Sequence, residues 1–319
     1  MPGASEREKV WFPSGDDKCA AWHYRGSNGA CVIMAGGFAV TKEAGTDKFA
    51  RRFHQAGFSV LAFDYRRLGE STGEPRLVLP VRDQIADWKA ALSFAAELPD
   101  VDATRIALWG FSASGGHVLR VAARNPAVAA VIAQTPNTDG LAAARNQARH
   151  QRPVAMLRFS GRGVLDALGG LAGRAPRLVP LAGKPGTLAV LTTPDAADAE
   201  RALNPENRYP DWRQAVAARS ALSMAWYSPG RVVSQVGCPL LVLVCDDDQS
   251  ALAAPAVRAC ERAPRGELVR LPGGHYEPFL AGYAHAAEAE LAFLRHHLLA
   301  AAPPPVPAPA RGLAAHRGG

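Results

Sequence analysis

Short, continuous apolar runs alternate along this chain with longer segments of helical periodicity, and this alternation most constrains the fold. Such runs are typical of strands that are buried on both faces of a parallel sheet. Strands that alternate with helices are joined by right-handed crossovers. We therefore expect an α/β protein with a mostly parallel central sheet flanked by helices. The expected strands are 10–12, 19–24, 30–34, 58–63, 106–109, 128–134, 238–245 and 267–271. The expected helices are 46–55, 80–98, 118–124, 254–262 and 283–299.

The alternation disappears between about residues 136 and 233, a segment rich in Ala, Arg, Pro and Gly. Its amphipathic stretches are short, and a Pro/Gly-rich piece separates them. They are residues 140–151, 154–161 and 212–226, with the Pro/Gly-rich piece at 169–194. We interpret 136–233 as a mostly helical cap inserted into a core of residues 1–135 and 234–300. Residues 301–319 are Pro-rich and then Gly-rich, which predicts a disordered tail.

Composition excludes several classes of protein. A hydrophobic content of 48% with 20% charged residues is ordinary for a soluble globular enzyme, and no apolar stretch is long enough to cross a bilayer. The first residues, 1–9, are polar and lack the apolar core of a signal peptide. Five cysteines without a CxxC pair predict neither a disulfide framework nor a metal site. A cytoplasmic location is therefore expected.

The chain is basic, with a net charge of +7 and a pI near 9.4, but its basic residues form no aromatic-interleaved stripe. Nucleic-acid binding is therefore not expected. The segment 140–194 contains eight basic residues and a single acidic one, Asp166. It could guide an anionic or carrier-bound substrate. The alternative is a solvated, arginine-rich surface, and a composition that favours arginine over lysine supports this second interpretation.

The stretch Gly110-Phe111-Ser112-Ala113-Ser114 follows the apolar run 106–109 and precedes a helical pattern. A strand, a sharp turn between small residues and a helix form a nucleophile elbow, which exposes a serine hydroxyl at its apex. Ser114 replaces the usual last glycine, but it is small, and two glycines follow it. The alternative is a glycine-rich turn that opens an ordinary helix. The elbow predicts Ser112 as a nucleophile.

A serine nucleophile needs a base, and the base needs an orienting acid. His275 lies in a glycine-rich loop just after a strand, whereas His117 lies on the elbow's own helix, where a structural role is expected. The acid should follow the apolar run 238–245. Spacing favours Asp248 over its neighbours Asp246 and Asp247, and Asp139 is a further alternative. The order Ser112, Asp248, His275 is the order expected of an elbow-type enzyme.

An oxyanion formed during acyl transfer needs two backbone N–H donors. One should come from Ala113, the residue after the nucleophile. The other should come from the loop after the run 30–34, where Gly36-Gly37 lets the backbone approach closely and Phe38 is best placed. The alternative for these glycines is a plain turn.

With these features the chain resembles the α/β-hydrolase fold serine hydrolases, in particular lysophospholipase- and dienelactone-hydrolase-like bacterial esterases with an inserted cap. The resemblance covers about residues 10–299. It is carried by residues 34–38, 63–66, 69–75 and 110–117, by Asp248 and by residues 274–275. Many relatives have histidine at the position of Gly36. Epoxide hydrolases and haloalkane dehalogenases of this fold place aspartate at the elbow, so Ser112 argues against both.

The resemblance implies a serine hydrolase that cleaves a small-molecule carboxylic ester or thioester through a Ser-His-Asp triad and an acyl-enzyme, with no metal or organic cofactor. An acyltransferase, thioesterase or cyclase could use the same triad. A non-catalytic binding protein on this scaffold is disfavoured because a complete triad can be assigned. The resemblance says little about the substrate, and the oligomeric state is not predicted.

Overall fold

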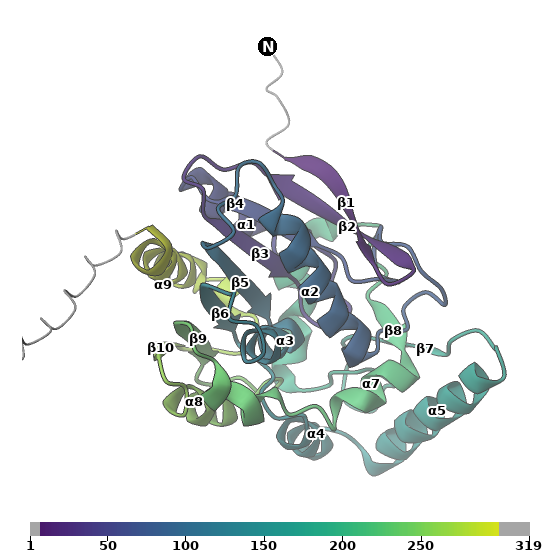
Figure 1. Cartoon of the computed structure of the whole chain (residues 1–319). Coiled ribbons are helices and arrows are strands. Elements are labelled where there is room, and N and C mark those ends of the chain that lie inside the picture. The colour runs from purple at the N-terminus through teal and green to yellow at the C-terminus, as the bar shows by residue number, and fades with distance from the viewer. Residues whose placement is uncertain (1–6, 300–319) are drawn as a thin grey trace, which may run out of the picture.

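A twisted sheet of eight strands forms the centre of the computed structural model, which describes residues 7–299 (Figure 1). The strand order is β1-β2-β4-β3-β5-β6-β9-β10. β1 and β2 pair antiparallel, β2 pairs antiparallel with β4, and every other pairing is parallel. The strands are β1 (Glu8–Ser14), β2 (Asp17–Tyr24), β3 (Cys31–Ala35), β4 (Ser59–Phe63), β5 (Ile106–Phe111), β6 (Ala130–Gln134), β9 (Leu240–Cys245) and β10 (Gly266–Leu271). The predicted α/β class with a mostly parallel sheet is confirmed, and the predicted tail 301–319 lies outside the described residues.

Helices cover both faces of this sheet. One face packs against α2 (Val81–Ala96), α3 (Ala113–Ala122) and α8 (Ala253–Glu261). The other face packs against α1 (Asp47–Gln55) and α9 (Tyr283–Leu294), which continues into a π-helical turn, η5 (Arg295–Leu299). Strands β3, β4, β5, β6 and β9 are buried along their whole length, which explains their uninterrupted apolar sequences.

Between β6 and β9 the chain leaves the sheet, and residues 136–233, the segment interpreted above as a cap and called the cap segment below, contain nine elements. Its elements are α4 (Gly140–Arg149), α5 (Pro153–Leu171), β7 (Leu178–Pro180), η1 (Pro194–Asp198), α6 (Ala199–Leu203), η2 (Pro205–Asn207), β8 (Ala215–Ala217), α7 (Ala218–Met224) and η3 (Pro229–Gln235). The amphipathic stretch 212–226 is not a single helix, because β8 precedes α7 and pairs antiparallel with β7. The last element, η3, packs on α3 and α8, so the chain has rejoined the core layer before residue 233.

Helix α5 extends ten residues beyond the helical stretch predicted at 154–161 (Figure 1). The glycines in this part of α5 lower its intrinsic helix propensity, but tertiary contacts keep the helix intact. A Cβ atom on Gly163 would lie 2.2 Å from Leu222 Cδ1, so glycine at this position allows α5 to pack closely on α7. The outer side of α5 exposes apolar residues such as Leu157, Leu168 and Leu171.

All five cysteines are free thiols in the structure. Over residues 7–299, no group of His, Cys, Asp or Glu side chains is arranged to hold a metal ion. In the same range no helix has the length and apolar character needed to cross a membrane.

Candidate active site

The turn between β5 and α3 holds Ser112 in a strained backbone conformation, with φ 56° and ψ −115°. A non-glycine residue rarely adopts such angles, and they are typical of functional sites. The turn requires small neighbours because the chain nearly touches itself. A Cβ atom on Gly110 would lie 2.4 Å from the carbonyl oxygen of Ser114. The predicted elbow is therefore present, with a half-buried serine at its apex.

The structure brings together the three side chains that the sequence singled out. Ser112 Oγ lies 3.0 Å from His275 Nε2, and His275 Nδ1 lies 2.7 Å from Asp248 Oδ2. An ionised carboxylate can only accept, so Nδ1 carries the proton and Nε2 is free to accept the proton of the Ser112 hydroxyl. The other oxygen of Asp248 accepts the N–H groups of Ser250 (2.8 Å) and Ala251 (2.6 Å), which fixes the carboxylate.

The other carboxylates considered from the sequence lie elsewhere. Asp246 is exposed and pairs with Arg270, and Asp247 is exposed. Asp139 caps the N-terminus of α4 by accepting the N–H groups of the first turn. His117 is buried against Tyr227 and Gln84, in keeping with the structural role expected for it.

The imidazole of His275 is 1% exposed. Burial lowers its pKa, but the carboxylates of Asp248 and Asp195 raise it more, so the pKa lies above its usual value. The ring of Phe111 lies 5.0 Å from the imidazole, centroid to centroid, and closes one side of it. The imidazolium is therefore stabilised by negative charge in a region from which water is largely excluded.

Two backbone N–H groups are available near Ser112. Across residues 7–299, neither the N–H of Phe38 nor that of Ala113 donates to a protein acceptor. Ala113 is the first residue of α3, where N–H groups lack intrahelical partners. Gly37 brings the other loop close, since a Cβ atom there would lie 3.4 Å from Ser112 Cβ. These are the two donors that the sequence suggested for an oxyanion.

A cavity of about 740 Å³ opens onto this cluster. Ser112, His275, Phe38 and Ala113 line it, and residues of the cap segment form most of the rest of the lining. The larger apolar side chains of this part of the lining are Met156, Phe159, Leu181, Leu191, Leu203, Trp212, Leu222 and Met224. Apart from His275, its charged lining consists of Lys184 and Glu200. A cavity of this size and character suits an apolar organic molecule.

The sequence profile of a family described as serine aminopeptidase, S33, matches residues 26–279, most of the chain. The chain belongs to this family of α/β-hydrolases. Among curated proteins, it is 37% identical over 275 residues to the quorum-quenching protein AidA of Acinetobacter baumannii, which covers 85% of this chain and 88% of AidA. It is also 33% identical over 182 residues to the polyketide transferase ATR5 of Stachybotrys chlorohalonatus, covering 56% of this chain and 58% of ATR5.

Solved structures of α/β-hydrolases share the fold. The α/β hydrolase GrgF from Penicillium superposes with a TM-score of 0.76 at 25% identity, covering 92% of this chain and 99% of GrgF. The esterase Pf2001 of Pyrococcus furiosus superposes with a TM-score of 0.61 at 18% identity, covering 92% of this chain and 93% of the esterase. The predicted relationship to serine hydrolases of this fold is confirmed.

In this S33-family chain, a buried relay holds the loop that carries Phe38. Trp88 Nε1 lies 2.8 Å from the Tyr65 hydroxyl, and that hydroxyl lies 2.5 Å from Ser114 Oγ. Ser114 Oγ in turn donates to the carbonyl oxygen of Gly36. The serine that replaces the last glycine of the elbow motif thus ties the elbow to the neighbouring loop.

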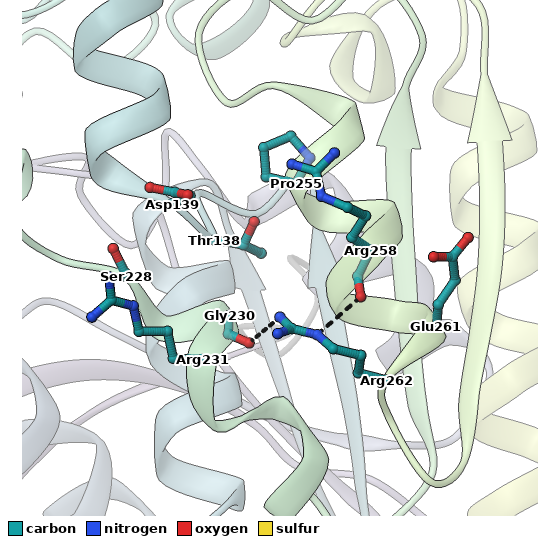
Figure 2. A pocket seen from close by; sticks show the side chains of 9 residues that line it. All are labelled: Thr138, Asp139, Ser228, Gly230, Arg231, Pro255, Arg258, Glu261 and Arg262. Atoms are coloured by element: carbon teal, nitrogen blue, oxygen red, sulfur yellow. Dashed lines mark hydrogen bonds between the residues drawn. The ribbon is translucent and has the colours of Figure 1, made fainter.

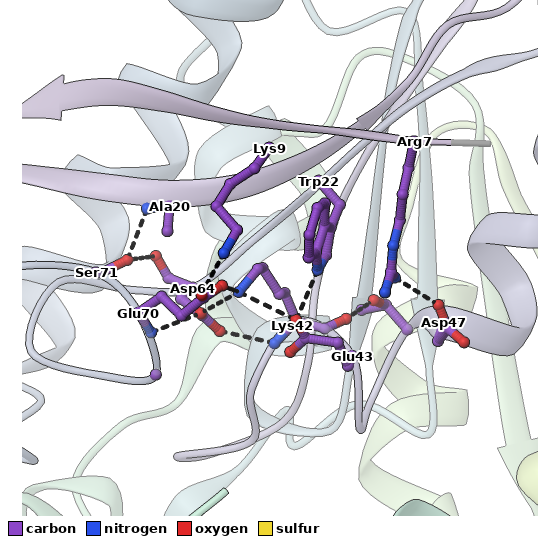
Figure 3. A network of polar contacts seen from close by, with 12 residues as sticks. Arg7, Lys9, Ala20, Trp22, Lys42, Glu43, Asp47, Asp64, Glu70 and Ser71 are labelled. Atoms are coloured by element: carbon purple, nitrogen blue, oxygen red, sulfur yellow. Dashed lines mark hydrogen bonds and ion pairs between the residues drawn. The ribbon is translucent and has the colours of Figure 1, made fainter. Parts of the chain in front are cut away.

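A second anchor holds the same loop further along (Figure 3). Lys42 is fully buried, and its Nζ lies 2.8 Å from Asp64 Oδ2 and 2.6 Å from Glu70 Oε2. The Lys42 N–H also donates to Asp64 Oδ1 (2.7 Å). Burial lowers the pKa of Lys42, but Asp64 and the neighbouring Glu43 and Glu70 raise it more, so the ammonium stays charged. Asp64, at the end of β4, therefore fixes the loop and does not contact the cluster around Ser112.

A smaller hollow of about 430 Å³ lies between α8 and η3 (Figure 2). Three arginines line it, and Arg262 among them donates to the carbonyl oxygens of Gly230 (2.7 Å) and Arg258 (3.2 Å). Ser112, His275 and Asp248 are not part of its lining. The larger cavity is therefore the one that serves the candidate active site.

Sequence reasoning missed Asp195, which lies in the cap segment and contacts the loops of both Asp248 and His275. No motif surrounds it, and the Pro/Gly-rich sequence before it gave no signal of a site. The only signal in the sequence is that Asp195 directly follows Pro194, because proline is common at the first position of a helical turn.

Proposed function

We propose that the protein is a serine hydrolase that cleaves an ester or thioester of an apolar acyl group through an acyl-enzyme on Ser112. The observation that carries this proposal is the continuous hydrogen-bonded series from Asp248 through His275 to Ser112, at 2.7 and 3.0 Å, with His275 and Ser112 lining an apolar cavity. The strained elbow and two unpaired N–H groups beside it support the same chemistry.

The reaction would begin when His275 Nε2 takes the proton of the Ser112 hydroxyl as Oγ attacks the acyl carbonyl carbon. The N–H groups of Phe38 and Ala113 would hold the oxyanion. His275 then gives the proton to the leaving alcohol or thiol, and the acyl group stays on Ser112. A water molecule, deprotonated by His275, attacks the acyl-enzyme. His275 then returns this proton to Ser112 Oγ as the bond between Oγ and the acyl carbon breaks, and the acid is released. Asp248 holds the imidazole in the required tautomer and stabilises its cationic form.

Cleavage is tested with the wild-type protein and its Ser112→Ala variant on matched series of esters, thioesters and lactones whose acyl chains increase in length. We expect turnover by the wild type to rise with chain length, because the cavity walls are apolar. We expect turnover to fall by at least about 10³-fold in Ser112→Ala. A fluorophosphonate probe should label the wild type at Ser112. Absence of labelling would favour a binding protein on a hydrolase scaffold.

Acyl transfer or cyclisation is the second candidate. The likeness to the polyketide transferases ATR5 and GrgF favours it, because the same acyl-enzyme can pass its acyl group to an alcohol, amine or thiol in place of water. Labelling of Ser112 together with thioester turnover that is accelerated by an added acceptor would support transfer. Equal rates with and without acceptors would support hydrolysis.

A further inference from the structure

A carboxylate from the cap segment enters the core of the candidate active site. Asp195, in η1, is 8% exposed. Its Oδ2 accepts the N–H groups of Gln249 (2.8 Å), Ser250 (3.2 Å) and His275 (3.3 Å). Its Oδ1 accepts the Ser250 hydroxyl (2.8 Å), which is also bonded to Thr193 at 2.8 Å. A buried carboxylate with this many donors is fixed in position.

These contacts connect two loops that are separated in the sequence by α8 and β10. The loop with Asp248 follows β9, and the loop with His275 follows β10. The bond between Asp248 and His275 depends on the relative position of the two loops, and Asp195 binds the backbone of both. The approach also needs Gly274, since a Cβ atom there would lie 3.0 Å from Asp195 Cβ. The glycine before the histidine therefore makes room for the cap carboxylate.

Asp195 also acts on the imidazole through its charge. Burial raises the pKa of Asp195, but His275 and the hydrogen-bond donors lower it more, so this carboxyl is ionised at neutral pH. The negative groups that act on His275 are Asp248, from the loop after β9, and Asp195, from η1. On the loop of His275 itself, Glu277 accepts the N–H of Gly282 (2.9 Å). Asp248 and Asp195 thus both raise the pKa of His275 and stabilise the imidazolium.

We propose that Asp195 is a positioning residue of the active site, which aligns the loops of Asp248 and His275 and adds a second negative charge to the catalytic base. This inference rests on the proposed function of Ser112 and His275. It makes the cap segment part of the catalytic apparatus as well as the wall of the cavity, because Thr193 and Pro194, next to Asp195, line that cavity.

Two substitutions separate the two roles. Asp195→Asn keeps the shape, and its amide oxygen can accept the three N–H groups while its amide nitrogen donates to Ser250, but the charge is gone. Asp195→Ala removes both the charge and the hydrogen bonds. Asp198→Asn is the matched control, since Asp198 belongs to the same short helix but is half exposed and pairs with Arg201.

The measurements are the pH dependence of kcat/KM, the split between kcat and KM at the pH optimum, and the rate of fluorophosphonate labelling. We expect Asp195→Asn to move the acidic limb of kcat/KM to lower pH by about one unit. We expect Asp195→Ala to lower kcat by about 10- to 100-fold with little change in KM. Asp198→Asn should match the wild type in all three measurements.

The inference is overturned if Asp195→Asn leaves the acidic limb in place, or if Asp195→Ala keeps the wild-type kcat. If Asp195→Ala does not fold, the position of the acidic limb in Asp195→Asn tests the proposal alone, and thermal unfolding checks that this variant is folded. A wild type that is neither labelled nor active would contradict the proposed function itself. A labelled, active wild type with unchanged Asp195 variants would contradict only the role of Asp195.

Discussion

The hydroxyl of Ser114 occupies the position where elbow motifs usually have glycine, and the direction of its hydrogen bonds is fixed. An indole N–H can only donate, so the Tyr65 oxygen accepts from Trp88 and gives its own proton to Ser114. A carbonyl oxygen can only accept, so Ser114 donates to Gly36. The peptide that follows is held by a hydrogen bond from the Val40 N–H to the Gly37 carbonyl (3.1 Å). Since a trans peptide points its N–H opposite to its C=O, these bonds orient the N–H of Phe38.

We therefore expect Ser114→Ala to lower kcat by about tenfold with little change in KM. Loss of a whole oxyanion donor costs about 10²- to 10³-fold, and a loosened one should cost less. Steady-state kinetics on one ester provide the measurement. Ser223→Ala, which removes an exposed hydroxyl that bonds within α7, is the control. A wild-type kcat in Ser114→Ala, accompanied only by a lower Tm, would mean that the relay has a purely structural role.

The raised pKa of His275 gives a second expectation at this scale. In the proposed mechanism, proton transfer from Ser112 requires the neutral imidazole, so activity should be present above this pKa and should be lost as the pH falls through it. We expect the acidic limb of kcat/KM to lie above about pH 6.5, the ordinary value for histidine. The measurement is kcat/KM between about pH 5 and 9, with recovery of activity after return to neutral pH as the control for unfolding. A limb well below pH 6.5 would contradict the electrostatic role of the two carboxylates.

At the scale of elements, α9 places a buried carboxyl group behind the central strand β5. Glu290 is fully buried, and its Oε2 accepts Trp109 Nε1 at 2.9 Å. Within residues 7–299, its other oxygen has no hydrogen-bond partner. Burial raises the pKa of Glu290 well above its usual value, an effect that the bond from Trp109 only partly offsets. The folded protein therefore keeps a proton here that the unfolded chain releases.

A group with a raised carboxyl pKa makes the folded state less stable as the pH rises from the unfolded value, about 4.5, to the folded value. The slope is at most about 1.4 kcal/mol per pH unit. We expect Glu290→Gln to remove this decline, so that the free energy of unfolding at high pH rises relative to the wild type. Denaturant unfolding across the pH range measures it. Glu288→Gln, in the same helix but exposed and paired with Arg52, should change little. Parallel pH profiles for wild type and Glu290→Gln would show that the carboxyl is ionised in the fold.

At the scale of the whole molecule, most basic residues of the segment 140–194 lie away from the cavity that opens onto Ser112. The segment 140–194 is strongly basic, yet the charged lining of the cavity besides His275 is one lysine and one glutamate. Most of the arginines therefore lie outside the space where a substrate would bind. Their field over the surface is screened beyond about 10 Å at an ionic strength of about 0.1 M. This arrangement agrees better with a solvated surface than with selection of anionic substrates.

We therefore expect a neutral ester and an otherwise identical ester with a distal carboxylate to share one salt dependence. The ratio of their kcat/KM values should stay within about twofold between about 0.05 and 0.5 M salt. The neutral ester serves as the internal control for general effects of salt on the enzyme. If the charged ester lost several-fold more activity than the neutral one, the basic segment would be guiding anions to the cavity.

The sequence by itself determined the sheet, the elbow and the order of the chemical groups. Apolar runs such as 30–34 and 106–109 are local patterns. A short, uninterrupted apolar run is typical of a strand that is buried on both faces, as both of these strands are. Local patterns do not predict the structure of the cap segment, because β8 and the second half of α5 form through contacts with distant residues. The apolar stretches of this segment are too short for their periodicity to distinguish a helix from a strand.

Only the tertiary structure decided which side chains meet. Asp246, Asp247 and Asp248 follow the same strand, and the fold of one loop turns Asp248 alone toward His275. Asp195 lies more than fifty residues before Asp248 along the chain, and most of the cavity walls come from the segment 136–233. Sequence spacing determines local conformation, whereas contact between distant loops depends on how whole elements pack. The α/β-hydrolase family could therefore be predicted from the elbow and its partners, but the carboxylate of Asp195 and the shape of the cavity could not.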